Sequence, residues 1–173
     1  MMLIRMTGAL AALLLASGVA FAQGKPTDPQ IAHIAYTAGQ IDIEAAQQAL
    51  QKSQNKDVRA FATNMETDHK AVNDKALALV KKLNVKPEDN DTSKALTKQA
   101  AEKRAELAKL SGAAFDKAYI DNEVAYHKVV NGALEKTLIP SASNGELKDL
   151  LTTGLKIFQG HEQHAEHVAA DLK

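Results

Sequence analysis

The stretch DVRAFATNMETDHKAVNDKALALVKKL, residues 57–83, decides the fold. Its inward positions recur at alternating steps of four and three residues, which places them on one side of an α-helix. A continuous seam of this kind is typical of helices packed in a bundle. The stretch therefore predicts a long bundle helix with one polar position, His69, in its seam. The inward positions are Val58, Ala62, Met65, His69, Val72, Ala76, Leu79 and Leu83.

Four further helices are predicted around this one. The first follows the helix-start signal Asp28-Pro29, in which Asp28 is the expected N-cap. The fourth is expected to stop before Pro140, because the residue before a proline disfavours helix. The predicted ranges are 29–54, 93–110, 113–139 and 146–172. The last of them repeats the seam at Leu147, Leu151, Gly154, Phe158, His161, Ala165, Val168 and Leu172.

Helix lengths indicate the topology. Four of the predicted helices have matched lengths of roughly 40 Å, and the helix at 93–110 is shorter, at about 28 Å. Placed along the outside, this short helix would carry the chain from one end of the bundle to the other. The sequence therefore predicts an all-α fold, a ferritin-like four-helix bundle with a long crossover that contains a shorter fifth helix. The alternative is a plain up-down bundle with the short helix as a lid.

Composition limits the chemistry. The chain has 173 residues, which suits one domain, and its 21 basic residues balance 21 acidic ones, so we expect no nucleic-acid partner. The absence of cysteine excludes disulfides, thiolate nucleophiles, iron–sulfur sites and covalently attached haem c. No phosphate-binding loop or serine–histidine–acid pattern is evident, so we predict no nucleotide cofactor and no catalytic residue.

The N-terminal segment is typical of a signal peptide. Arg5 precedes a short apolar run, and Ala20-Phe21-Ala22 provides a small-residue cleavage site before Gln23. We predict a signal peptide at 1–22, a flexible leader at 23–28 and one helical domain at 29–173, exported to a bacterial periplasm or cell envelope. No later segment is long and apolar enough to span a bilayer.

A layer of polar residues is predicted near the middle of the bundle. His69 and His161 replace apolar residues in two seams, and His127 and Glu44 are contributed by the fourth and first helices. In the crossover topology, a rise of about 1.5 Å per residue places all four roughly 18–25 Å from one end. Further donors near this depth are Glu66, Glu123 and His164, and Asp68 and Tyr126 are expected to orient a histidine.

Besides a metal site, two other interpretations of the layer are open. In the first, the histidines and Glu44 form a dry hydrogen-bonded network, since an unpaired buried polar group costs about 1–3 kcal/mol. Alternatively, the helical register differs from the one assumed and some of these side chains face solvent; His164 and His167 are candidates for the outer face.

The motifs resemble those of a known family. Asn64-Met65-Glu66-Thr67-Asp68-His69 resembles the "Met, two residues, Asp-His" signature of the domain-of-unknown-function family 4142. Phe115-Asp116, Tyr119 and His127 resemble its second segment, His161 with Ala165 its closing motif, and Glu44 occupies the place of its first-helix glutamate. Lys156 stands where the family usually has proline. The resemblance covers about 28–172 and implies a ferritin-like fold and export, without an activity.

Three functions follow as hypotheses. The first is a metal-binding bundle for buffering or envelope stress protection, with Glu44, His69, His127 and His161 as ligands. The second is a non-enzymatic envelope interaction or stress module with a structural polar layer. The third is a metal-dependent oxidoreductase with two metals, which needs Glu66 and Glu123. A histidine-rich layer suits one zinc, copper, nickel or iron ion better than a carboxylate-bridged pair. A homodimer is left open.

Overall fold

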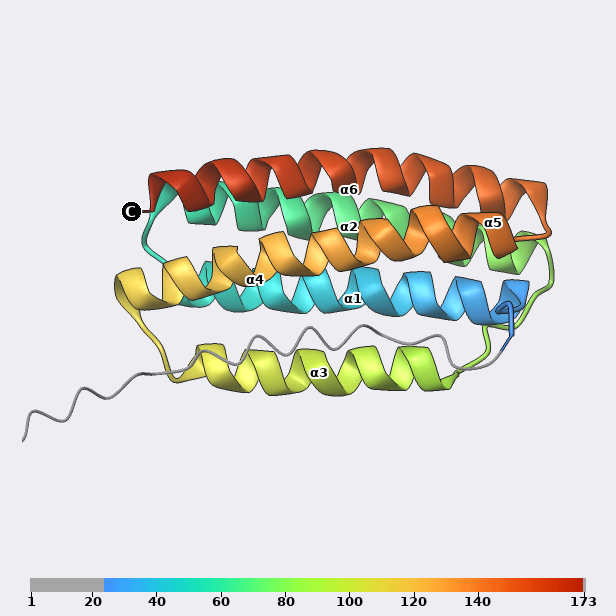
Figure 1. The fold of residues 1–173 in the computed structure, drawn as a ribbon, viewed down its shortest axis with the longest axis horizontal. Helices are drawn as coiled ribbons and strands as arrows, with labels where there is room; N and C mark the ends of the chain where they lie inside the picture. Colours follow the sequence, from blue (N-terminus) through green and yellow to red (C-terminus); the bar gives the residue numbers. More distant parts are fainter. Residues whose placement is uncertain (1–23, 173) are drawn as a thin grey trace, which may run out of the picture.

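The computed structural model describes residues 24–172, which form a bundle of helices (Figure 1). No strand occurs within that range, so the all-α prediction is confirmed. The predicted signal peptide and Gln23 lie outside the described residues. The elements are α1 Asp28–Lys52, α2 Lys56–Lys82, α3 Asp91–Ala108, α4 Gly112–Ala133, the π-helical turn η1 Leu134–Leu138, the short α5 Ile139–Ser141, and α6 Gly145–Asp171.

The helices form two antiparallel hairpins joined by a crossover. α1 packs along α2, and α4 packs along α6 (Figure 1). α3 lies outside the bundle beside α1 and carries the chain from the end of α2 back to the start of α4. As a result α2 and α4 run in the same direction, which is the predicted crossover arrangement rather than the plain up-down alternative.

Polar side chains fix how the hairpins begin. The Asn55 side chain accepts hydrogen bonds from the backbone N–H groups of Asp57 and Val58, at 2.9 and 3.2 Å, and so caps α2. The N-cap of α1 is Thr27 and not Asp28 as predicted. The Asp28 carboxylate instead accepts backbone N–H bonds from Ser143 and Asn144, at 2.8 and 2.9 Å, and ties the start of α1 to the turn before α6.

The fourth predicted helix does not stop before Pro140. It continues through η1 and α5 to Ser141. Pro140 has no N–H to donate to the carbonyl four residues earlier, and its ring would crowd that carbonyl in a regular helix. The chain adds a residue to the turn instead, and the Ile139 N–H donates to the carbonyl of Leu134, five residues back. The proline therefore widens the helix into a π turn rather than ending it.

Two apolar clusters fill the interior, one toward each end of the bundle. One contains Phe61, Met65 and Phe115, and the other contains Leu134 and Leu151. In α6, every predicted inward position from Leu147 to Val168 is buried, as the seam predicted. In α2, the burial of Phe61 and Asn73 was not predicted, and Val72, Ala76 and Leu79 are only partly buried. Among the described helices, none combines the length and apolar character needed to cross a membrane.

Candidate metal centre

Three helices bring three histidines together between the two apolar clusters. His69 comes from α2, His127 from α4 and His161 from α6, and they are only 2%, 1% and 6% exposed. Their ring centroids lie 5.2 to 5.8 Å apart. One ring nitrogen from each lies within 4.8 Å of one from each of the others, a spacing at which the three could hold one cation.

The partners of His127 and His161 determine which ring nitrogen is free. His127 Nδ1 lies 3.0 Å from the backbone carbonyl of Glu123, so it carries the hydrogen and Nε2 keeps its lone pair. His161 Nε2 lies 3.0 Å from the Asp68 carboxylate and donates to it, which leaves the lone pair on Nδ1. Both free nitrogens are buried without a hydrogen-bond partner among the described residues. Metal-binding histidines are commonly oriented in this way through their second nitrogen.

His69 is the least satisfied of the three. Its ring stacks on Phe158, with centroids 4.5 Å apart and the planes at 7°. Nε2 lies 3.4 Å from Asp42 Oδ2, but neither ring nitrogen makes a hydrogen bond of acceptable geometry within the described part of the chain. Each unsatisfied buried donor or acceptor costs about 1–3 kcal/mol. The protein thus holds a polar ring in place at a cost to its own stability.

Burial keeps the three imidazoles uncharged. Burial lowers the pKa of His69 well below its ordinary value, and electrostatic repulsion between the protonated forms of His69, His127 and His161 lowers it further. Burial also lowers the pKa of His127, to about 4, and that of His161, although the Asp68 carboxylate raises the latter in part. Neutral imidazole is the form that binds metals, so metal binding at neutral pH would not require a histidine to lose a proton.

A pair of buried carboxyl groups adjoins the histidines. Asp42 of α1 and Glu123 of α4 are 2% and 1% exposed, and their oxygens lie within 4.8 Å of each other and of a His127 nitrogen. Burial raises the pKa of Glu123 to about 7, and burial together with the Glu123 charge raises that of Asp42 well above its usual range. No lysine or arginine pairs with either carboxyl in the described structure. A bound cation would supply the positive charge that neither carboxyl group has as a partner.

Two predicted ligands lie outside this centre. The Glu44 side chain is 40% exposed, and its carboxylate pairs with Arg104 of α3 at 2.8 Å. The Glu66 carboxylate pairs with Lys70 at 2.6 Å and accepts a hydrogen bond from Gln47 at 3.0 Å. Both point away from the histidine layer because their helical positions fall on the outer faces of α1 and α2.

The remaining predicted residues are divided between the centre and its surroundings. Glu123 belongs to the centre, and Asp68 orients His161 as expected. His164 packs edge-on against Phe61, with ring centroids 5.2 Å apart, and does not join the three histidines. The Tyr126 hydroxyl donates to the backbone carbonyl of Ala38 at 3.1 Å and orients no histidine.

Asp42 is the residue that the sequence analysis missed. It lies four residues after Ala38 and three before Ala45, both of which are buried. This spacing places Asp42 on the same face. Glu44 is two residues further along, about 200° around the helix. Its depth along the bundle matched that of the histidines, but its direction did not.

Comparisons with known proteins identify the family of the chain and a similar fold. The family model Domain of unknown function (DUF4142) matches residues 15–168, and the chain belongs to this family. No curated protein matches the chain. Among solved structures, the fold is similar to that of a candidate secreted protein, DUF305, from Streptomyces coelicolor, with a TM-score of 0.71 and 11% identity over 83% of this chain and 91% of that one. At this identity the likeness shows the helical fold alone.

Proposed function

We propose that this DUF4142 protein is exported and binds one transition-metal ion with His69, His127 and His161. The observation that carries the proposal is a cluster of three buried histidines in which one ring nitrogen of each lies within 4.8 Å of one from each of the others. Each of the three also has a buried ring nitrogen without a hydrogen-bond partner among the described residues. Asp42 and Glu123 stand beside them as oxygen donors. The site is therefore a nitrogen-rich one with a carboxyl group available to complete the coordination.

A metal accounts for the layer better than a dry hydrogen-bonded network does. A structural network is expected to pair its members, because each buried group left unsatisfied costs about 1–3 kcal/mol. Here one ring nitrogen of His127 and one of His161 are held by Glu123 and Asp68, whereas the other ring nitrogen of each is buried without a partner among the described residues. This one-sided pairing is the pattern of ligands oriented for an ion.

The donor set narrows the class of ion. Imidazole nitrogens suit zinc, copper, nickel and iron, whereas calcium and magnesium prefer sites made of oxygen donors. One ion rather than two is proposed, because Glu66, which a dinuclear centre would need, pairs with Lys70 outside the layer. We therefore propose no carboxylate-bridged dinuclear oxidase centre.

The proposed role is metal buffering or protection of the cell envelope. The signal-peptide features of residues 1–22 support export. A closed, buried site with three neutral ligands suits retention of an ion rather than rapid turnover of a substrate.

The test is metal stoichiometry and affinity for the mature chain, expressed without a polyhistidine tag. Zinc, copper(II), nickel and iron(II) are each titrated into chelator-treated protein by calorimetry, with bound metal measured by mass spectrometry. The variant His127→Leu replaces one proposed ligand with an apolar side chain of similar bulk. His167→Leu is the matched control, because His167 is 78% exposed and pairs only with Asp171.

We expect about one ion per wild-type and control chain, and an affinity at least tenfold lower for His127→Leu. Equal binding by His127→Leu and wild type would refute the site. Failure of all four ions to bind wild type would refute metal binding and favour the structural layer of an interaction module.

A further inference from the structure

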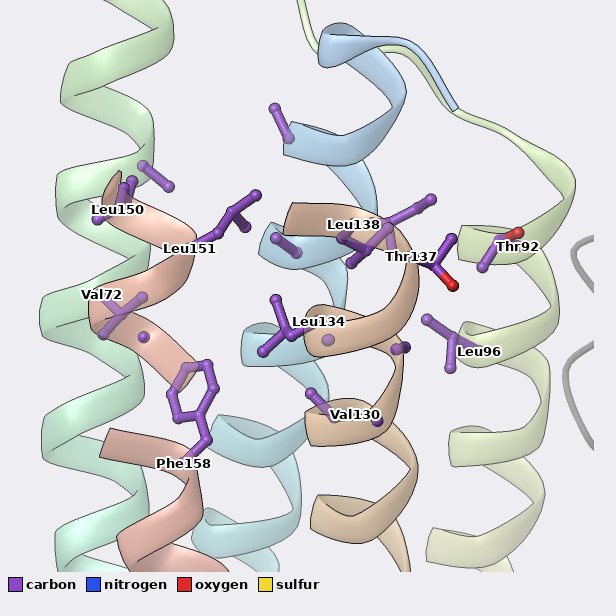
Figure 2. Close-up of a pocket in the computed structure, with 18 of the residues that line it drawn as sticks. Val72, Thr92, Leu96, Val130, Leu134, Thr137, Leu138, Leu150, Leu151 and Phe158 are labelled. Atoms are coloured by element: carbon purple, nitrogen blue, oxygen red, sulfur yellow. The ribbon is translucent and has the colours of Figure 1, made fainter. Parts of the chain in front are cut away.

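A separate cavity of about 360 Å³ opens beside the histidine layer, toward the end of the bundle that holds η1. Its walls come from α1, α2, α3, α4, η1 and α6. Figure 2 shows Val72, Leu151 and Phe158 on one side of it and Leu134, Thr137 and Leu138 of η1 on the other, with Thr92 and Leu96 of α3 beyond. The lining is mostly apolar, with Asn73, two threonines and two lysines as its polar members, so the cavity is chemically unlike the metal centre.

Two features of the sequence create this space. The π turn at Leu134–Leu138 widens the helix at the cavity wall, and π turns of this kind often occur at functional sites. Small residues line the wall next to it, among them Gly132 and Ala133. A Cβ atom added at Gly132 would meet no atom within 4 Å. A volume of about 360 Å³ lies within the range of ordinary small-molecule pockets.

The size and lining indicate what the cavity would hold. Water needs polar partners in a buried site, and apolar cavities bind apolar molecules instead. A cavity of about 150 Å³ accommodates benzene. At the same ratio of carbon atoms to volume, a space of 360 Å³ accommodates at most about 14 carbons.

The charges at the cavity select the head of such a molecule. Its charged lining residues are Lys128 and Lys136, and no acidic residue lines it. Lys128 pairs with Glu166 at 2.6 Å. Lys136 is exposed and forms no ion pair among residues 24–172, and the hydroxyl-bearing Thr137 is its neighbour in η1. An anionic head at the exposed edge would complement Lys136.

We propose that this cavity binds a single-chain fatty acid of about 10–14 carbons, with its chain among the aliphatic side chains and its carboxylate at Lys136. Apolar chain and anionic head match the two kinds of surface that the cavity offers. None of the proposed metal ligands lines the cavity, although Phe158 of its wall stacks on His69, and binding requires no metal ion.

The first test blocks the cavity. Dodecanoate, below its micelle concentration, is titrated into the chelator-treated mature chain by calorimetry. Gly132→Leu places a side chain where there is open space, and Gly160→Leu makes the same change at an exposed helical glycine outside the cavity. We expect saturable binding by wild type and Gly160→Leu, and at least a tenfold loss for Gly132→Leu. Both substitutions remove a helical glycine, so thermal unfolding should show both variants folded.

The second test concerns the head group. Dodecyltrimethylammonium has the same chain with a cationic head and should bind more weakly than dodecanoate. Lys136→Gln should reduce dodecanoate affinity about threefold to fivefold, as expected for an exposed ion pair, whereas Lys156→Gln on the exposed face of α6 should not. No saturable binding of dodecanoate, equal binding by the two glycine variants, or equal binding of the two amphiphiles would overturn the proposal.

Discussion

Replacing His69 with leucine should stabilise the metal-free protein. Both ring nitrogens of His69 are buried without a hydrogen-bond partner in the described structure, and each costs about 1–3 kcal/mol. Leucine removes both and keeps apolar contact with Phe158, but it loses the ring stacking, worth about 0.5–1.5 kcal/mol. The two costs add to about 2–6 kcal/mol, and subtracting the lost stacking leaves an expected net gain of about 0.5–5.5 kcal/mol in the free energy of unfolding. For a chain of this size the melting temperature should rise by roughly 1–22 °C.

The assay is urea and thermal unfolding of chelator-treated His69→Leu and wild type, followed by helical circular dichroism. His167→Leu serves as the control and should change stability by no more than about 0.5 kcal/mol, as for most exposed positions. In a second arm, zinc at about 100 times its dissociation constant should stabilise wild type by about 2.7 kcal/mol and His69→Leu by much less. A metal-free His69→Leu that is less stable than wild type by 1 kcal/mol or more would refute the reasoning, because the histidine would then be paired and structural.

Three further predictions concern single contacts. Glu123→Gln should flatten the pH dependence of metal-free stability. Burial raises the pKa of Glu123 in the folded protein from 4.5 to about 7. The stabilisation that the protonated Glu123 provides is therefore complete below about pH 4.5 and is lost as pH rises through 7. Urea unfolding at several pH values should show the unfolding free energy of the variant rising relative to that of wild type between about pH 5 and 8. Asp42→Asn should weaken metal affinity, whereas Glu44→Gln, which alters contacts with Arg104 and Gln40 outside the histidine layer, should leave metal affinity unchanged in the same titration. Asn55→Ala should cost about 1 kcal/mol in unfolding free energy through loss of the α2 cap, and a loss below about 0.3 kcal/mol would count against that cap.

The fold was predictable because helical periodicity carries most of it. The seam of α6, from Leu147 to Val168, is buried throughout, since a regular step of four and three residues fixes one face of a helix. The crossover followed from the matched helix lengths. The π turn was not predictable from Pro140 alone, because whether a proline ends a helix or widens it depends on what packs around it.

The histidines of the centre were predictable and the acidic residues only partly so. His69, His127 and His161 interrupt apolar faces, so the sequence itself marks them as inward. Asp42 is just as inward, but its neighbours Ile41 and Ile43 are also buried and blur the face of α1. Depth along the bundle selected Glu44 in its place, although only the angle around the helix decides which carboxylate meets the histidines.

The outer position of α3 also bears on how the molecule moves. Only Ser93 and Leu107 of this helix are buried, so detaching it from α1 exposes little apolar surface compared with unfolding the four-helix body. Local opening of so lightly packed an element requires far less free energy than global unfolding, and its backbone amides should exchange with solvent first. Thr92 and Leu96 of α3 line the apolar cavity. Fraying of this one helix would therefore admit a molecule to the cavity while the histidine layer stays closed.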